Sequence, residues 1–150
     1  RSAIDAGASY TFETTLGGRT VTDILERAAR GGAEVRIWYA GLASVELHLA
    51  RVAARVRLGG HDIPAADIRR RYGASQRNLV HLMPHLTELV VFDNSVDADP
   101  LGASPPEPAL VLHLRRGRAL APRDLRGTAE WAKAIVAAAI KLGGTPMRGG

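Results

Sequence analysis

The sequence has 150 residues, the length of one ordinary domain, and 46% of them are hydrophobic, which is enough to bury a core. It contains no cysteine, which excludes a disulfide framework, a thiol nucleophile and a cysteine-ligated zinc site. The formal net charge of +5 is carried almost entirely by arginine, which indicates either a GC-rich genome or an anionic partner such as nucleic acid or a small-molecule phosphate.

The first part of the chain alternates predicted strands and helices. Aromatic residues and threonines alternate over residues 8–15, which predicts a strand. Apolar residues share one face over residues 19–30, which predicts a helix. Residues 35–40 form a second, more apolar predicted strand. Ser44 then has the side chain of an N-cap for a helix over residues 45–58.

The alternation continues to the end of the chain. Pro64 suits the first turn of another helix. The elements expected after it are a helix over 75–85, a strand over 88–95, a surface loop over 97–108, a strand over 109–114, a helix over 129–142 and a frayed tail over 143–150. The side chains expected in the core are Leu79, Leu82, Met83, Leu86, Trp38, Phe92 and Trp131.

Strands that alternate with helices favour an α/β fold in three layers, with a mostly parallel sheet covered on both faces. We expect a single domain over residues 1–150. In such sheets ligands bind beyond the carboxyl ends of the strands. That rule selects Glu13, Thr14, Thr15, Gly41 and the turn Asp93–Ser95 as candidates.

An arginine-rich segment, RLGGHDIPAADIRRRY, occupies residues 57–72. Its glycine pair, Gly59 and Gly60, has the backbone freedom of a hinge that closes a lid. Guanidinium groups keep their charge and bind phosphate with two hydrogen bonds, so a lid rich in arginine fits a phosphate ligand. The predicted phosphate ligands are Arg55, Arg70 and Arg71, followed by Arg51 and Arg57. The alternative is a solvated helix face with ion pairs to Glu46, Asp62 and Asp67.

Three segments together resemble the zeta-toxin-like P-loop kinases, which include small bacterial proteins labelled predicted ABC-type ATPases. The segments are FETTLGGRT at residues 12–20, RVAARVRLGGHDIPAADIRRRY at 51–72 and LVVFDNS at 89–95. The resemblance covers about residues 3–95 and implies a P-loop NTPase fold that transfers phosphate from ATP, with Mg²⁺, to a hydroxyl of a small acceptor. Characterised zeta toxins imply UDP-N-acetylglucosamine as that acceptor and an antitoxin protein as a partner. Other branches of the family act on other acceptors.

The sequence departs from the family in one large block. The family begins with a strand, the P-loop G-x-x-x-x-G-K-[ST] and a helix, followed by an acidic residue that activates the acceptor. Neither Lys133 nor Lys141 lies in such a motif. We therefore expect the chain to be the C-terminal two-thirds of such a domain, inactive alone. The alternative is a family member that has evolved without the loop.

The resemblance also implies roles for individual residues. Glu13 and Thr15 would bind the acceptor, and Arg19 would meet an acceptor phosphate. The alternative for Glu13 is an exposed acid at a strand end. His61 is either a phosphate donor or a turn residue paired with the neighbouring aspartate. Asn94 either lies near the nucleotide base or forms a plain Asx turn.

Other function classes fit the sequence less well. The arginine content suggests a non-enzymatic nucleic-acid-binding or regulatory domain, but the basic residues cluster around one hinge and lack interleaved aromatic residues for base stacking. A third alternative is that the protein is a catalytically inactive regulator. His81 and His85 share a helix face without a third ligand, so no metal is expected. No run approaches the roughly 20 apolar residues of a membrane span, so we expect no membrane partner and a cytoplasmic location.

Overall fold

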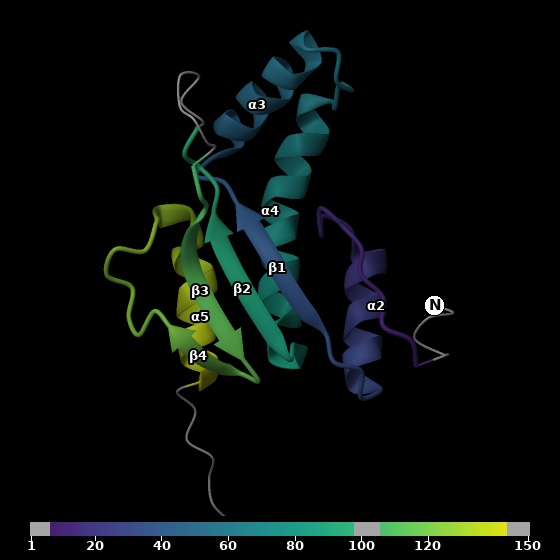
Figure 1. Ribbon diagram of the computed structural model, residues 1–150, viewed down its shortest axis with the longest axis vertical. Helices are drawn as coiled ribbons and strands as arrows, with labels where there is room; N and C mark the ends of the chain where they lie inside the picture. Colours follow the sequence, from purple (N-terminus) through teal and green to yellow (C-terminus); the bar gives the residue numbers. More distant parts are fainter. Residues whose placement is uncertain (1–6, 98–105, 144–150) are drawn as a thin grey trace, which may run out of the picture.

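The computed structural model describes residues 7–97 and 106–143. Figure 1 shows how the helices and strands are arranged. In chain order they are α2 (Arg19–Arg30), β1 (Arg36–Gly41), α3 (Val45–Arg57), α4 (Ala65–Leu82), the 3₁₀ turn η1 (Met83–His85), β2 (Glu88–Asp93), β3 (Ala109–Arg115), β4 (Arg118–Ala121), the 3₁₀ turn η2 (Glu130–Ala132) and α5 (Lys133–Gly143).

The strands form one four-stranded sheet in the order β1-β2-β3-β4. β1 and β2 are parallel, whereas β2 with β3 and β3 with β4 are antiparallel. The expected α/β fold is therefore confirmed, but the sheet is mixed rather than mostly parallel. Between β3 and β4 only Arg116 and Gly117 intervene, and so short a turn joins antiparallel strands alone.

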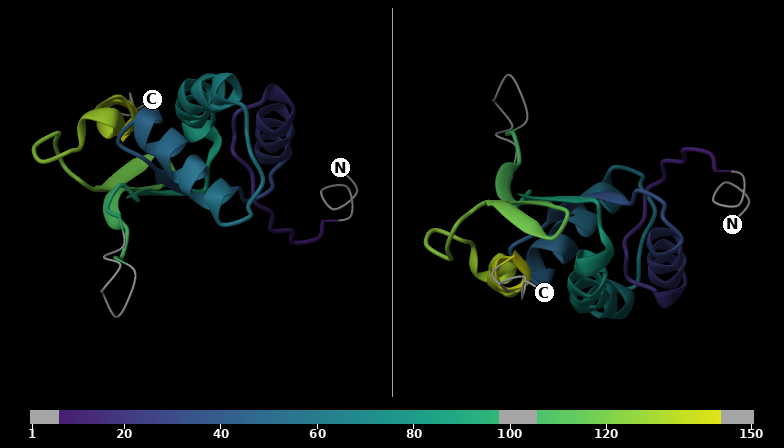
Figure 2. Two further views of the ribbon diagram at one scale, coloured as in Figure 1. Left: turned by 90° about the horizontal axis from the view of Figure 1, so that it is seen from above. Right: turned by 90° about the horizontal axis from the view of Figure 1, so that it is seen from below.

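The helices α2, α4 and α5 lie against one face of the sheet, and α3 stands with α4 beyond its carboxyl end (Figure 2). In the part of the chain that the structure describes, no helix covers the other face. The described residues thus make two layers, where the sequence favoured three.

The core lies between the sheet and these helices. Leu89 and Val91 of β2 and Leu112 and Leu114 of β3 face the helices and are fully buried, and α4 and α5 supply the opposite side of the core. Four of the side chains expected in the core are buried, with exposed fractions of 0–4% for Leu79, Leu82, Met83 and Leu86. Burial of each such side chain contributes about 1.5–3 kcal/mol, so this interface holds the fold together. The other large aliphatic side chains that are fully buried in the described chain are Ile135 and Val136. Trp131 is partly buried against the core, whereas Phe92 is half-buried on the opposite face of the sheet, because Leu89 and Val91 are the residues of β2 that face the helices.

One long helix replaces the two expected between Pro64 and His85. α4 runs for 18 residues through Gly73, although a glycine in a helix interior costs about 1 kcal/mol. Its buried residues Ile68, Ser75, Leu79 and Leu82 lie on one helical face, and their burial outweighs that cost. α4 therefore connects the carboxyl end of the sheet with its core.

Three further expectations are corrected. Residues 8–15 form no strand, and Tyr10 and Phe12 stack on each other in an exposed segment with ring centroids 5.8 Å apart. β4 was not predicted, because four residues carry too little pattern. Trp38 is 65% exposed rather than buried, because successive residues of a strand face opposite sides and its neighbours face the helices.

Candidate functional site

The carboxyl ends of the two parallel strands lie side by side and are tied together. Asn94 N, just after β2, donates to Gly41 O at 2.9 Å. In the loop after β1, Ala43 N donates to Ser95 Oγ at 2.7 Å. The side chain of Asp93 in turn accepts from Ser95 N at 3.0 Å. The two loops therefore form one fixed platform, beneath the hairpin of α3 and α4 (Figure 1).

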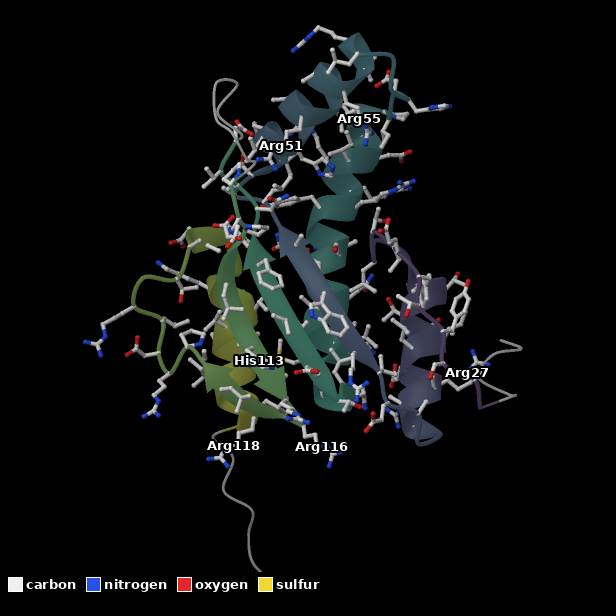
Figure 3. The ribbon with its side chains drawn as sticks, in the orientation of Figure 1. Arg27, Arg51, Arg55, His113, Arg116 and Arg118 are labelled. Atoms are coloured by element: carbon white, nitrogen blue, oxygen red, sulfur yellow. The ribbon has the colours of Figure 1, made fainter. Side chains whose placement is uncertain are left out.

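Arg51 fastens α3 to this platform. Its guanidinium donates to Asn94 O at 2.6 Å, to Val96 O at 3.2 Å and to Asp97 Oδ1 at 2.8 and 3.0 Å. Figure 3 shows Arg51 midway along α3, on the side of the strand ends. Because the guanidinium is occupied in this way, Arg51 acts here as a structural link, and sequence reasoning missed this role because its partners lie more than 40 residues away.

The start of α3 follows the sequence closely. The predicted cap is confirmed, since Leu47 N donates to Ser44 Oγ at 3.1 Å. One turn on, burial lowers the pKa of His48, and the nearby charges of Arg55 and Arg51 lower it further. A neutral histidine therefore lies near the two arginines of α3.

The glycine pair after α3 makes a tight turn. Gly59 has φ +89°, a left-handed conformation that favours glycine. A Cβ on Gly60 would lie 2.6 Å from Arg55 Cγ, so the chain passes directly over the stem of that arginine. Arg55 is exposed and lies on α3 near its junction with α4 (Figure 3). The glycines thus have a demonstrated packing role, and the hinge motion stays a prediction.

The three arginines at the start of α4 have different surroundings. Arg69 Nη1 lies 3.2 Å from Glu46 Oε1 on α3, and Arg70 Nη2 lies 2.7 Å from Asp67 Oδ1. These two follow the alternative of a solvated helix face with ion pairs, as the sequence allowed. Arg71 differs, because its Cβ and Cγ would lie 3.0 and 2.9 Å from a Cβ on Gly17. The backbone of the FETTLGG segment therefore approaches Arg71 closely.

The predicted acceptor residues belong to that segment. Glu13 and Thr15 are exposed and lie outside any strand, and Arg19 is the first residue of α2. Leu16, which lies between Thr15 and Arg19, is 3% exposed. Its carbonyl accepts a hydrogen bond from Asn78 Nδ2 of α4 at 2.7 Å. Hence α4 holds the end of this segment through Asn78 while its first turns carry the arginines. His61, in the turn before α4, is exposed.

Tyr72 is the last residue of the segment RRRY, and the sequence did not indicate a role for it. Its hydroxyl donates to Leu42 O at 2.8 Å, which ties α4 to the loop after β1. One turn later, Ser75 Oγ donates to Tyr39 Oη at 3.1 Å. Burial raises the pKa of Tyr39 and that of Tyr72, so both remain neutral hydrogen-bonding groups.

A cavity of about 510 Å³ lies at the other end of the sheet. None of the predicted site residues lines it. Its polar lining comes from the loops before β1 and β2 and from the turn after β3, and includes Glu34, His85, Thr87 and Arg116. The contact between Arg71 and the acceptor segment, at Gly17, lies away from this cavity.

His81 of α4 and His85 of η1 share a carboxylate partner that the sequence did not indicate. Glu26 of α2 lies with its Oε2 2.9 Å from His81 Nε2 and its Oε1 3.6 Å from His85 Nε2. Arg30 also donates to Glu26 Oε1, at 2.7 Å. Hydrogen bonds from His81 and Arg30 lower the pKa of Glu26 to about 2. Across residues 7–97 and 106–143, no group of three or more acidic or histidine side chains is arranged to hold a metal ion.

One curated protein resembles part of the chain. An uncharacterised protein of Haemophilus influenzae strain Rd is 36% identical over 70 residues, which is 47% of this chain and 50% of that protein. The chain therefore spans about half the length of this curated relative. No family model matches the chain, and neither does any solved structure. Within the described ranges, no helix is both long and apolar enough to cross a bilayer.

Proposed function

We propose that the chain is the C-terminal part of an ATP-dependent phosphotransferase of the zeta-toxin-like P-loop kinase class. The intact protein transfers the γ-phosphate of ATP to a hydroxyl group of a small acceptor in the cytoplasm. UDP-N-acetylglucosamine is the first acceptor to test, and an antitoxin is the first protein partner to test. The proposal rests on the three resembling segments and on how they lie relative to each other.

The observation that carries the proposal is the meeting of all three segments at one edge of the sheet. The segment at residues 89–95 ends in the platform, and the segment at 51–72 forms the hairpin above it. The segment at 12–20 approaches that hairpin where Gly17 packs against Arg71. Ligands bind beyond the carboxyl ends of the strands in sheets of this kind, so convergence at this edge favours a shared binding task.

Within the described chain β1 pairs with a strand on one side only, and its other edge has room for a preceding strand. Val35 O and Gly41 O both accept from the neighbouring segments on the β2 side. Because backbone groups alternate along a strand, those of Arg36, Trp38 and Ala40 point toward the free edge. Residues 8–15 have the sequence of a strand but no partner in the described chain. A preceding strand would pair with the outward backbone groups of β1 and would give residues 8–15 a neighbour. In this class such a strand leads into the P-loop.

Phosphoryl transfer needs positioning and charge neutralisation more than covalent chemistry. Arg55, Arg70 and Arg71 would hold phosphate oxygens, while Glu13 and Thr15 accept and donate hydrogen bonds to the acceptor. Asn94, held over the platform, would lie near the base, and Arg19 and His61 remain further candidates. Mg²⁺ would supply charge neutralisation at the phosphates. The three-layer arrangement of the class would place helices on the second face of the sheet.

The test uses the natural protein that contains these 150 residues. We expect its sequence to include a strand followed by G-x-x-x-x-G-K-[ST] and the protein to transfer labelled phosphate from ATP to a hydroxyl acceptor. Substitution Arg71→Ala should lower kcat/KM about 100-fold or more, whereas Arg77→Ala, on the same helix, should leave it unchanged. The 150-residue chain alone should bind Mg-ATP weakly or not at all. A natural protein without the loop and without ATP binding would refute the proposal.

A further inference from the structure

The cavity at the amino ends of β1 and β2 is lined by none of the residues that the proposed function uses. Its volume of about 510 Å³ lies in the range of about 300–1,000 Å³ that is typical of small-molecule sites. Its walls come from α2 and the loop after it, from η1 and the loop after it, and from the turn between β3 and β4. Ala28 of α2 and Met83 of η1 pack in the core on the helix-covered side of the sheet, so helices on the other face would not fill the cavity.

Backbone hydrogen bonds fix the walls of the cavity relative to one another. Thr87 N donates to Val35 O at 2.9 Å, which joins the loop before β2 to the loop before β1. Arg116 N donates to Thr87 O at 2.9 Å, which adds the turn after β3. At the end of α2, Ala33 N donates to Ala28 O at 3.0 Å. The cavity is therefore preformed, and a ligand that enters it does not have to order these loops.

Arg116 occupies a backbone position that suits other residues better. Arg116 and Gly117 form the two-residue turn between β3 and β4, and their φ angles are +46° and +74°. Hairpin turns with positive φ at both positions favour Asn-Gly or Asp-Gly, because the left-handed conformation is sterically costly for most residues that have a Cβ. A costly conformation of this kind beside a cavity indicates that the side chain has a task other than the turn.

The ion pair with Glu34 does not explain this choice of residue. Arg116 Nη2 lies 3.6 Å from Glu34 Oε1, and both side chains are more than half exposed. Exposed pairs contribute little to stability. Glu34 also has a closer partner, because Arg36 Nη2 lies 2.5 Å from its Oε2. Arg116 can therefore exchange its contact with Glu34 for a contact with a ligand.

The charge at this end of the sheet favours an anionic ligand. Strand register places four charged residues in one row across the strands: Arg36, Glu88, Arg115 and Arg118. Figure 3 shows Arg116 and Arg118 at this end. Together with Arg116 and Glu34, the row gives four arginines and two carboxylates. The resulting positive potential attracts anions to the cavity.

We propose that this cavity binds a small organic anion, whose carboxylate or phosphate oxygens accept two hydrogen bonds from the guanidinium of Arg116. The planar fork of a guanidinium group matches both kinds of anion. His85 and Thr87 add polar groups to the lining, and Leu86 adds an apolar surface for the carbon atoms of the ligand. Glu34 can accept a hydrogen bond from a hydroxyl or amino group of the same molecule. This ligand is distinct from ATP and from the acceptor, which the proposed function places at the opposite end of the strands.

The experiment is titration of the 150-residue chain with succinate and with inorganic phosphate at constant ionic strength, followed by the amide chemical shifts in nuclear magnetic resonance spectra. We expect saturable shifts at Glu34, Thr87, Arg116 and Gly117, with a dissociation constant of roughly 0.1–10 mM, as suits probes with so few atoms. Tighter binding of succinate would assign the site to a carboxylate, and tighter binding of phosphate would assign it to a phosphate ester. Succinamide, which has a similar shape without charge, should cause no saturable shift.

Two matched variants separate a built site from general attraction by positive charge. Arg116→Gln should raise the dissociation constant at least tenfold, because the two charge-assisted hydrogen bonds are lost. Arg118→Gln makes the same change of charge on the same hairpin at a residue that does not line the cavity, and it should change the constant less than twofold.

A third variant tests whether the arginine is kept for a ligand. Arg116→Asn should abolish binding and yet raise the melting temperature by about 1–3 °C, because Asn-Gly is the preferred pair in such a turn. A purely structural role of Arg116 predicts the opposite change in melting temperature.

Four results would overturn the inference. They are the absence of a saturable shift with either anion, shifts confined to the arginines of α3 and α4, an equal loss of affinity in Arg116→Gln and Arg118→Gln, and a lower melting temperature of Arg116→Asn. These measurements involve neither ATP nor the longer protein. The inference and the proposed kinase function therefore fail independently of each other.

Discussion

The contact between Gly41 and Trp131 gives the sharpest prediction about the candidate site. Gly41 is the last residue of β1 and part of the platform. A Cβ at this position would lie 2.0 Å from Cη2, 2.3 Å from Cζ3 and 2.7 Å from Cζ2 of the Trp131 ring. Non-bonded carbons prefer separations of about 3.5–4.0 Å, so the ring would have to retreat by roughly 1.5 Å. We therefore expect Gly41→Ala to destabilise the fold.

The expected size follows from overpacking. Extra methyl groups in a packed site cost about 1–3 kcal/mol. In a domain of this length each kcal/mol lowers the melting temperature by about 2–4 °C, so Gly41→Ala should lower it by about 2–12 °C. Trp131 cannot simply turn away, because its ring packs against the core. Its Nε1 is already buried without a hydrogen-bond partner in the described part of the chain.

Thermal unfolding followed by circular dichroism measures the effect. Gly18→Ser is the control, because a Cβ at Gly18 meets nothing within 4 Å. There the serine would supply the side-chain cap that α2 lacks, and stability should stay equal or rise by a few tenths of a kcal/mol. A double-mutant cycle with Trp131→Leu then isolates the contact. If Gly41→Ala costs as much beside Leu as beside Trp, the steric explanation is wrong.

Further predictions concern the helix layer. The lowered pKa of Glu26 gives stability that is fully present above pH 4.5 and lost as the pH falls toward 2, so the difference in melting temperature between wild type and Glu26→Gln should shrink over that range. Leu79→Ala should cost about 2–5 kcal/mol in urea unfolding, whereas Leu58→Ala should stay within about 0.5 kcal/mol. Arg51→Ala should speed hydrogen exchange of the amides of residues 94–97, and equal rates in both proteins would show that the arginine does not hold this turn.

Local pattern was sufficient for much of the fold. The helical spacing over residues 19–30 gave the bounds of α2, and the cap at Ser44 gave the start of α3. The predicted buried set of α4 and η1 was confirmed, because the 3.6-residue period identifies which side of a helix is apolar. The sequence also brought the arginines of residues 51–72 to the carboxyl edge, since a helix that follows a parallel strand starts there.

Local sequence pattern could not predict contacts between residues that are far apart in the chain. Residues 8–15 have strand composition, but a strand also needs a neighbour, and the described chain offers none. Arg51 belongs to an arginine-rich helix face, and only the return of the chain at residues 94–97 makes it a structural link. Glu26 likewise pairs with two histidines that lie more than 50 residues away in the sequence, and only the packing of the helices brings them together.

The sequence by itself determined the α/β class, most of the helices and strands, and the apolar side of the helices, because these depend on periods of a few residues. Only the tertiary structure decided that the sheet is mixed, that helices cover one of its faces in the described chain, and that Trp38 faces outward. The direction of a strand and the covering of a face depend on which distant segments pair. That choice is made by packing over the whole chain, where each local pattern is compatible with several arrangements.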